Sequence, residues 1–285
     1  MILLYSIFAD QWNNVPPRPL YSGGEGGIQQ GTRMSLRLLH ERQFHDHQAA
    51  ARARDLRASD YAFTDDSYLG HESWIAAAFA ALGDVRGQRV LDLGCGHGMA
   101  SVVLARRGGL VTACDLSLGY VREADTRAEA NGVTPRFVVC DGNRLPFADR
   151  SFERIWGNAI LHHLDLNVAA AELRRVLIPG GIGVFCEPWA GNRWLSLARS
   201  VLPYPGKHRT ADESPLAHRD LHRLRAVFPS LTVRGHQLLS MLGRVVRHHR
   251  LVTSLAWCDE MLLRRLPRWQ RYCRYVVVVV RKDGA

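Results

Sequence analysis

The chain has 285 residues, 47% of them hydrophobic and 22% charged, which is typical of a globular protein with a sizeable core and excludes a disordered or collagen-like chain. Basic side chains outnumber acidic ones by 37 to 27, and the formal charge of +10 permits contact with phosphate-rich partners without requiring it. The six cysteines form no Cys-x-x-Cys pair, and no apolar run is long enough to span a membrane. We therefore expect a cytoplasmic protein without bound metal or nucleic acid.

The first segment, residues 1–33, is rich in proline and glycine and cannot bury enough apolar surface to order itself. The sequence therefore predicts a disordered tail there, and Met34 is a candidate for the biological start. Residues 34–285 are predicted to form a single domain. Its first part, residues 34–85, is rich in good helix formers, and two helices are expected within it, at residues 35–58 and 68–82.

The second part of this domain, residues 86–188, has short apolar runs separated by helical stretches. This pattern indicates repeated strand–helix–strand units and a mainly parallel sheet. Apolar residues recur at close to every 3.6 positions over residues 165–177, which predicts a helix that ends before Pro179 and two glycines. The five predicted strands are Arg89–Leu93, Leu110–Cys114, Arg136–Cys140, Arg154–Asn158 and Ile182–Cys186.

The third part, residues 189–285, contains two more predicted strands, Leu231–Arg234 and Tyr275–Val280, which bring the sheet to seven. A helical insertion with two basic amphipathic stretches is expected before the last strand. Its residues 238–268 predict either a cover over a hydrophobic ligand or a peripheral contact with an anionic membrane. The polar segment 209–216 suits either a lid that closes on a substrate or a solvated connector.

The strongest chemical signal is Val-Leu-Asp-Leu-Gly-Cys-Gly-His-Gly at residues 90–98, where a predicted strand turns through alternating glycines into a helix. Alternating glycines let the backbone approach a ligand closely, and the helix N-terminus presents N–H groups to a carboxylate or phosphate. A dinucleotide-binding loop needs Gly-x-Gly-x-x-Gly. The third position is Met99 when counted from Gly94, and Ser101 when counted from Gly96, so the dehydrogenase fingerprint is absent.

Further motifs follow this loop. Asp115 closes the second strand, Asp141-Gly142 closes the third, and the chain continues through Leu145 to Phe152, Asn158 to Leu164 and Arg175 to Gly181. Together with an acidic residue two positions before the first glycine, this series resembles the class I S-adenosylmethionine-dependent methyltransferases. The similarity covers Val90 to Pro188, and it is greatest to the small-molecule branch that includes ubiquinone and menaquinone biosynthesis methyltransferases.

This resemblance implies an α/β, Rossmann-like fold: a seven-stranded, mainly parallel sheet with helices on both faces and S-adenosylmethionine at the carboxyl ends of the strands. In the family, the glycines face the methionine moiety, the acid after the second strand accepts the ribose hydroxyls, and the acid after the third lies by the adenine. The cofactor-binding residues expected here are Asp92, Gly94, Cys95, Gly96, Asp115, Leu116, Asp141, Gly142 and Asn158.

Three residues are candidates for catalysis. His162 and His163 follow the fourth strand and Glu187 ends the fifth, near the expected position of the methyl acceptor. An imidazole can take a proton from an acceptor at neutral pH. Each histidine is explained equally well as a packed or helix-capping residue, and alignment alone lowers the barrier to methyl transfer, so a general base is optional.

The predicted function is S-adenosylmethionine-dependent methylation of an oxygen, nitrogen or carbon atom of a small-molecule acceptor. One alternative is a regulatory module that binds the cofactor without turnover. Another is a methyltransferase that acts on RNA or on a membrane-associated lipid. Methylation of nucleobase amino groups is not expected, because Asn158-Ala159-Ile160-Leu161 stands where that branch has an Asn- or Asp-Pro-Pro-aromatic tetrad.

Overall fold

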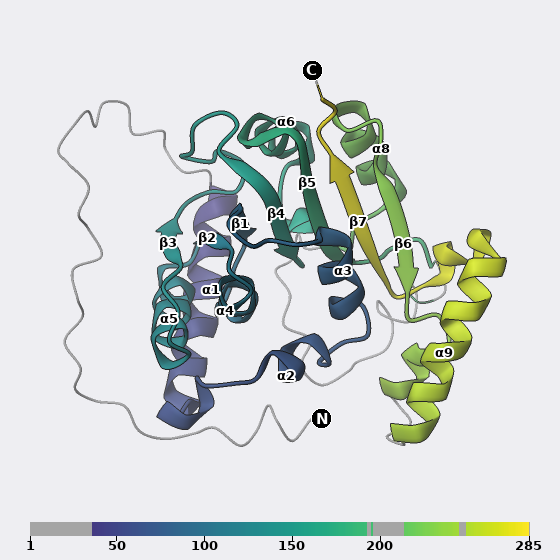
Figure 1. Cartoon of the computed structure of the whole chain (residues 1–285), viewed down its shortest axis with the longest axis horizontal. Helices are drawn as coiled ribbons and strands as arrows, with labels where there is room; N and C mark the ends of the chain where they lie inside the picture. Colours follow the sequence, from purple (N-terminus) through teal and green to yellow (C-terminus); the bar gives the residue numbers. More distant parts are fainter. Residues whose placement is uncertain (1–35, 193–194, 196–213, 245–248, 285) are drawn as a thin grey trace.

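The computed structural model describes residues 36–192, 195, 214–244 and 249–284 (Figure 1). The predicted tail, residues 1–33, lies outside them. The centre is one sheet with the strand order β3-β2-β1-β4-β5-β7-β6. Its strands are β1 Arg89–Leu93, β2 Leu110–Asp115, β3 Arg136–Val139, β4 Phe152–Asn158, β5 Leu177–Pro188, β6 Thr232–His236 and β7 Tyr275–Arg281.

The strand directions confirm the predicted mainly parallel sheet. Strands β1 to β5 pair in parallel, whereas β7 is antiparallel to both β5 and β6. The chain runs outward from β1 to β3 and then crosses back to β4, which lies on the other side of β1. Open α/β sheets bind ligands at the carboxyl ends of the strands beside such a reversal, so the topology directs attention to the ends of β1 and β4.

Helices cover both faces of the sheet, as predicted (Figure 1). One face packs against α6 (Leu166–Val176) and α8 (His218–Val227), and the other against α3 (Ile75–Leu82) and α4 (Met99–Arg106). Neighbouring strand residues alternate between the two cores: Val184 belongs to one and Phe185 to the other, and both are fully buried. This alternation buries both faces of the parallel strands.

The N-terminal helices differ in part from the prediction. The expected helix 35–58 is α1, Leu36–Asp55, which packs along α5, Leu118–Ala130. The expected helix 68–82 is instead two helices, α2 (Asp65–Leu69) and α3. The prediction of one helix was wrong because Gly70 caps α2 through its N–H, and α3 starts only at Ile75, after Trp74 as its N-cap.

The helix over residues 165–177 ends before Pro179 as predicted, but the fifth strand starts earlier than expected. Helix α6 ends at Val176, and Pro179 with its two glycines lies inside the first part of β5 rather than in a loop. Gly180 adopts φ 77°, and its N–H donates to the carbonyl of Lys282, so these residues continue the sheet through an irregular register with β4. Glycine tolerates this conformation, which a sequence pattern interprets as a helix stop.

The helical insertion before the last strand is confirmed. It contains η3 (Ser240–Arg244), α9 (His249–Arg265) and η4 (Pro267–Tyr272), so the first amphipathic stretch is a 3₁₀ helix in its described part. Residues 209–213 of the predicted lid or connector lie outside the described residues. Its last residue, Leu216, is fully buried and pairs with Trp189. No helix of the described residues is long and apolar enough to cross a membrane.

Candidate functional site

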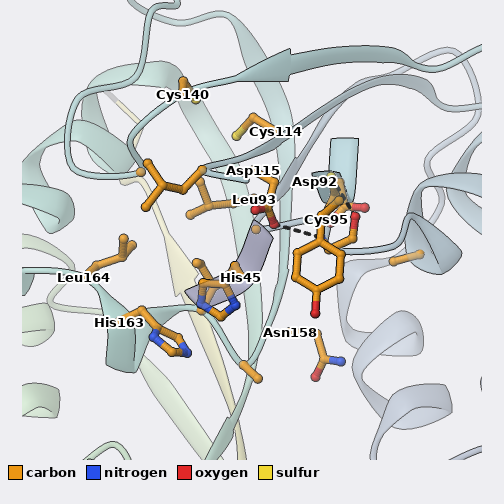
Figure 2. Close-up of a pocket in the computed structure, with 18 of the residues that line it drawn as sticks. His45, Asp92, Leu93, Cys95, Cys114, Asp115, Cys140, Asn158, His163 and Leu164 are labelled. Carbon is orange, nitrogen blue, oxygen red and sulfur yellow. Dashed lines mark hydrogen bonds between the residues drawn. The ribbon is translucent and has the colours of Figure 1, made fainter. Parts of the chain in front are cut away.

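A cavity of ≈ 270 Å³ opens at the carboxyl ends of β1, β2, β3 and β4 (Figure 2). Helix α1 and Tyr120 of α5 also contribute to its wall. His163 of η2 (Leu161–His163) lines the cavity, whereas His162 and Glu187 do not. The structure brings together at this cavity every residue predicted to bind the cofactor: Asp92, Gly94, Cys95, Gly96, Asp115, Leu116, Asp141, Gly142 and Asn158.

The loop between β1 and α4 requires glycine at two cavity positions for different reasons. Gly94 has φ 66°, and a Cβ there would lie 2.6 Å from Cδ1 of Ile160. Gly96 has φ 50°, and a Cβ there would meet nothing within 4 Å. A side chain at Gly96 would therefore project into open space beside the cavity, where a ligand can lie directly against the backbone.

Asp92 is a buried carboxyl group at the base of this loop. Its Oδ2 accepts a hydrogen bond of 2.5 Å from the hydroxyl of Ser101 in α4. Burial raises the pKa of Asp92 to about 7, because the hydrogen bond from Ser101 only partly offsets the loss of water and the charge of Asp115 opposes ionisation further. Near neutral pH both the protonated and the ionised form of this group are therefore populated.

Asp115 and Asp141 end the next two strands of the site. Asp115 accepts a 2.9 Å hydrogen bond from the backbone N–H of Gly96 (Figure 2) and another of 2.9 Å from that of Ser117, and burial raises its pKa. Oδ1 of Asp141 accepts from both the backbone and side-chain nitrogens of Asn143, each at 2.8 Å. Both carboxylates are thus held rigidly, and their remaining lone pairs can accept from a ligand.

Asn158, at the end of β4, has a buried Oδ1 atom without a hydrogen-bond partner in the described part of the chain. Nδ1 of His97, another cavity residue, is likewise buried without a hydrogen-bond partner among the described residues. Unsatisfied buried polar atoms are rare because each carries a desolvation cost. These two atoms fit a ligand with its own polar groups at this end of the cavity, such as an ammonium group donating to Asn158.

His162 and Glu187 form a buried pair behind the cavity wall. The distance between Nδ1 of His162 and Oε2 of Glu187 is 2.6 Å, and their side chains are 3% and 0% exposed. Oε1 of Glu187 accepts from the backbone N–H groups of Ile160 and Leu161. Glu187 therefore orients both the β4–η2 turn and the His162 ring, and it does not itself line the cavity.

The sequence prediction missed the contribution of α1. Four α1 residues line the cavity, at positions that share one face of a helix: Leu38, Glu41, His45 and Gln48. The sequence signal that could have identified them is the polar row Glu41, His45 and Gln48 along one face of the predicted helix. Nothing local to that helix indicates that it packs on α5 beside the strand ends, so its residues could not be assigned to the site.

Three of the cavity residues are cysteines, namely Cys95, Cys114 and Cys140 (Figure 2). Burial raises the pKa of the Cys95 thiol, and a hydrogen bond with Cys140 together with burial raises that of Cys114. Both are therefore neutral thiols near pH 7 rather than nucleophiles. Among the described residues, no group of three or more histidine, cysteine or acidic side chains is arranged to hold a metal ion.

Comparison with known sequences assigns this site to a family. The family model described as a methyltransferase domain matches residues 91–185. The demethylmenaquinone methyltransferase of Beutenbergia cavernae is 34% identical over 192 residues, which cover 62% of this chain and 78% of that protein. The enzyme of the same name from Streptomyces griseus is 36% identical over 194 residues, which cover 66% of this chain and 80% of that protein.

Solved structures agree on the fold. The methyltransferase solved in complex with the Haloferax volcanii Trm112 activator has a TM-score of 0.55 at 19% identity, and the match covers 86% of this chain and 98% of that one. Geranyl diphosphate C-methyltransferase from Streptomyces coelicolor, solved with S-adenosylhomocysteine, has a TM-score of 0.50 at 18% identity, with 83% of each chain covered. Because the fold, the strand-end residues and these relatives agree, the chain belongs to the class I S-adenosylmethionine-dependent methyltransferases.

Proposed function

We propose that this chain transfers a methyl group from S-adenosylmethionine to a small organic acceptor. The observation that carries the proposal is the convergence of the glycine loop and three strand-end acids on one cavity. Related proteins are named for small organic acceptors: demethylmenaquinone and geranyl diphosphate. These names, together with the absence of the Pro-Pro-aromatic sequence after Asn158, favour a small molecule over a nucleobase.

The residues present fit this cofactor. The open space at Gly96 suits its carboxylate end, and the unpartnered Oδ1 of Asn158 suits its ammonium group. The lone pairs of Asp115 suit the two ribose hydroxyls, and Asp141 with Gly142 suits the adenine edge. When bound, S-adenosylmethionine supplies a methyl carbon that is activated by the positive sulfur beside it.

The protein itself contributes alignment of the acceptor with the methyl group and control of where the histidine protons lie. A closed cavity that holds an acceptor in line with the methyl group supplies roughly 7–11 kcal/mol of barrier reduction in favourable cases. Glu187 holds Nδ1 of His162 at 2.6 Å, and a carboxylate accepts the Nδ1 proton, so in the neutral ring Nε2 carries the lone pair. His163, which lines the cavity beside this ring, is the histidine of η2 proposed to contact the acceptor.

A second observation favours an acceptor that is reached at a membrane surface. Leu266 and Trp269 are 41% and 43% exposed within a stretch whose arginines are also exposed, namely Arg264, Arg265, Arg268 and Arg271. Such a combination suits an anionic lipid interface. Strand β6 runs in the same direction as β5, so the insertion leaves the sheet at the edge where the cavity lies. We therefore propose peripheral membrane contact through the predicted stretch 238–268 and the adjoining residues up to Arg271.

Methyl incorporation separates the candidate functions. The purified chain is incubated with S-adenosylmethionine labelled in the methyl group and, separately, with naphthohydroquinones, other phenols, prenyl lipids in vesicles, and total RNA. Label in an organic acceptor supports the proposal. Label in RNA alone would replace it with RNA methylation, and cofactor binding without incorporation into any of these acceptors would favour a regulatory module.

A further inference from the structure

Helix α1 contributes polar side chains to the cavity wall, and none of them is among the residues proposed to bind the cofactor. His45 of α1 and His163 of η2 lie with their ring centroids 5.6 Å apart at an interplanar angle of 74° (Figure 2). Oε1 of Glu41, which is 7% exposed, lies 4.0 Å from Nδ1 of His163. Two imidazoles and a carboxylate therefore meet at a place where segments far apart in the sequence come together.

The position of this wall is fixed by contacts between α1 and α5. Oδ1 of Asp46 accepts hydrogen bonds from the hydroxyl of Ser117 at 2.5 Å and from the backbone N–H of Gly119 at 3.2 Å. One turn and a half further along, Arg52 pairs with Glu123 at 3.0 Å. His45 lies beside Asp46, so its place at the cavity is determined by hydrogen bonds rather than by loose packing.

The tautomer of His45 follows from its neighbours. Nδ1 of His45 is 3.3 Å from Oε1 of Gln48, and the same oxygen accepts from the hydroxyl of Tyr120 at 3.2 Å. An amide oxygen only accepts, so Nδ1 of His45 carries the proton and Nε2 carries the lone pair in the neutral ring. His45 is thus set up as a proton acceptor. This assignment depends on the orientation of the Gln48 amide, for which the Tyr120 hydroxyl is the second donor.

Carboxyl groups lie near both rings of the histidine pair. Glu41 lies beside His163, and Asp115 is within electrostatic reach of His45. The titratable groups that face the rings are Glu41 on α1, Asp115 at the end of β2, Tyr120 on α5 and His162 on η2.

We propose that His45 is a catalytic base for a hydroxyl-bearing acceptor bound in the cavity beside the His45–His163 pair, with His163 as its partner and Glu41 as a positioning residue. This inference rests on the proposed function. The acceptor O–H proton passes to Nε2 of His45, the acceptor oxygen forms the bond to the methyl carbon, and the C–S bond breaks with its electron pair going to sulfur. The products are a methyl ether, a neutral thioether and an imidazolium that solvent deprotonates.

The test uses para-nitrophenol, whose visible absorbance reports its ionisation, in the presence of saturating S-adenosylhomocysteine. The full chain is compared with His45→Gln, His163→Gln and a matched control, His47→Gln, which changes an exposed histidine of the same helix outside the cavity. We expect nitrophenol affinity to fall by about tenfold or more in the first two variants, as for loss of a charge-assisted hydrogen bond, and to hold in the control. S-adenosylhomocysteine affinity should stay within about twofold in all of them.

Three outcomes would overturn the inference. One is that the wild-type chain binds the cofactor product but not nitrophenol, and another is that His45→Gln leaves nitrophenol binding unchanged. The third is that His45→Gln weakens S-adenosylhomocysteine and leaves nitrophenol binding intact, which would make His45 a cofactor contact. Failure of the wild-type chain to bind S-adenosylhomocysteine would instead contradict the proposed function itself, so the two failures are distinguishable.

Discussion

Oε2 of Glu187 lies 2.6 Å from Nδ1 of His162, and the same carboxylate accepts two backbone N–H groups of the turn that follows β4. The carboxylate thereby links the end of β5 to the end of β4, two strands that are neighbours in the sheet. It holds both the histidine ring and the backbone that leads to His163. The pair therefore affects acceptor chemistry through orientation, without lining the cavity.

Glu187→Gln tests this role. The amide oxygen can still accept from the turn, so the fold should hold, but a neutral amide no longer favours the proton on Nδ1 of His162. We expect turnover to fall by up to about 10²-fold, because a small misplacement of the turn that carries His163 also misaligns the acceptor, with S-adenosylhomocysteine affinity unchanged. Steady-state kinetics and calorimetry measure the two quantities. Unchanged turnover would limit Glu187 and His162 to a structural role.

Gly96→Ala tests whether a ligand lies against the loop backbone. The added methyl group has space within the protein, so the free energy of unfolding falls only by the strain of φ 50°, on the order of 1 kcal/mol. The methyl group does, however, occupy the position proposed for the ligand. Gly132→Ala is the matched control, because Gly132 has φ 67°, equally open surroundings and no place in the cavity. We expect only the first variant to lose S-adenosylmethionine affinity in calorimetry, by more than about tenfold. Equal affinities would contradict a ligand at Gly96.

Asp92 predicts a specific pH dependence of stability. Its pKa is about 7 in the folded chain, against an ordinary value of 3.8, so the folded state binds this proton more tightly. The resulting contribution to the free energy of unfolding is complete below about pH 4 and is lost as the pH rises through about 7. Asp92→Asn does not titrate. We therefore expect it to gain stability relative to wild type between about pH 5 and pH 8, by at most about 4 kcal/mol.

Urea unfolding at several pH values measures this difference. Asp66→Asn, which changes an exposed carboxylate, is the control and should show no such trend. A wild-type-minus-variant difference that stays constant over the same range would mean that Asp92 is ionised throughout. The cationic cofactor should also favour the ionised form of Asp92, so binding of S-adenosylmethionine should release protons near neutral pH.

The membrane proposal is tested by vesicle sedimentation. We expect wild-type protein to pellet with anionic phosphatidylglycerol vesicles at low salt, and the Leu266→Ala, Trp269→Ala double variant to pellet several-fold less, because about 2–4 kcal/mol of apolar burial is lost. Leu110→Ala is the control, since Leu110 is 61% exposed at the amino-terminal edge of the sheet. Equal pelleting of the two variants would contradict membrane docking through Leu266 and Trp269.

The sheet was predictable because its central strands are continuous apolar runs ended by glycine or acidic residues. Each acid that closes a strand, such as Asp115 or Asp141, reaches the common edge by topology alone, so the cofactor side of the site follows from the sequence. The acceptor side does not. His45 reaches the cavity only because Asp46 and Arg52 bind α5, and such a tertiary contact leaves no periodic signal in the sequence.

The element boundaries show the same limit at a local scale. Gly70 ends α2 within a stretch whose composition favours one helix, and Gly180 continues β5 where a Pro-Gly-Gly run is typical of a loop. Gly180 does so at φ 77°, a conformation that composition alone does not predict. Glu187 was predicted to contact the acceptor because it ends a strand at the right edge. Its hydrogen bonds to the β4–η2 turn became visible only in three dimensions.

Calorimetric titration of the purified chain with S-adenosylmethionine, S-adenosylhomocysteine and NADH tests the central claim most directly. We expect micromolar binding of the first two and none of NADH, because the loop lacks the third glycine of the dinucleotide fingerprint. Asp115→Asn keeps an oxygen for the N–H of Gly96 but removes the charge, and it should weaken both ligands by about 10- to 100-fold. NADH binding, no binding of S-adenosylmethionine, or unchanged affinity in Asp115→Asn would contradict the assignment of this cavity.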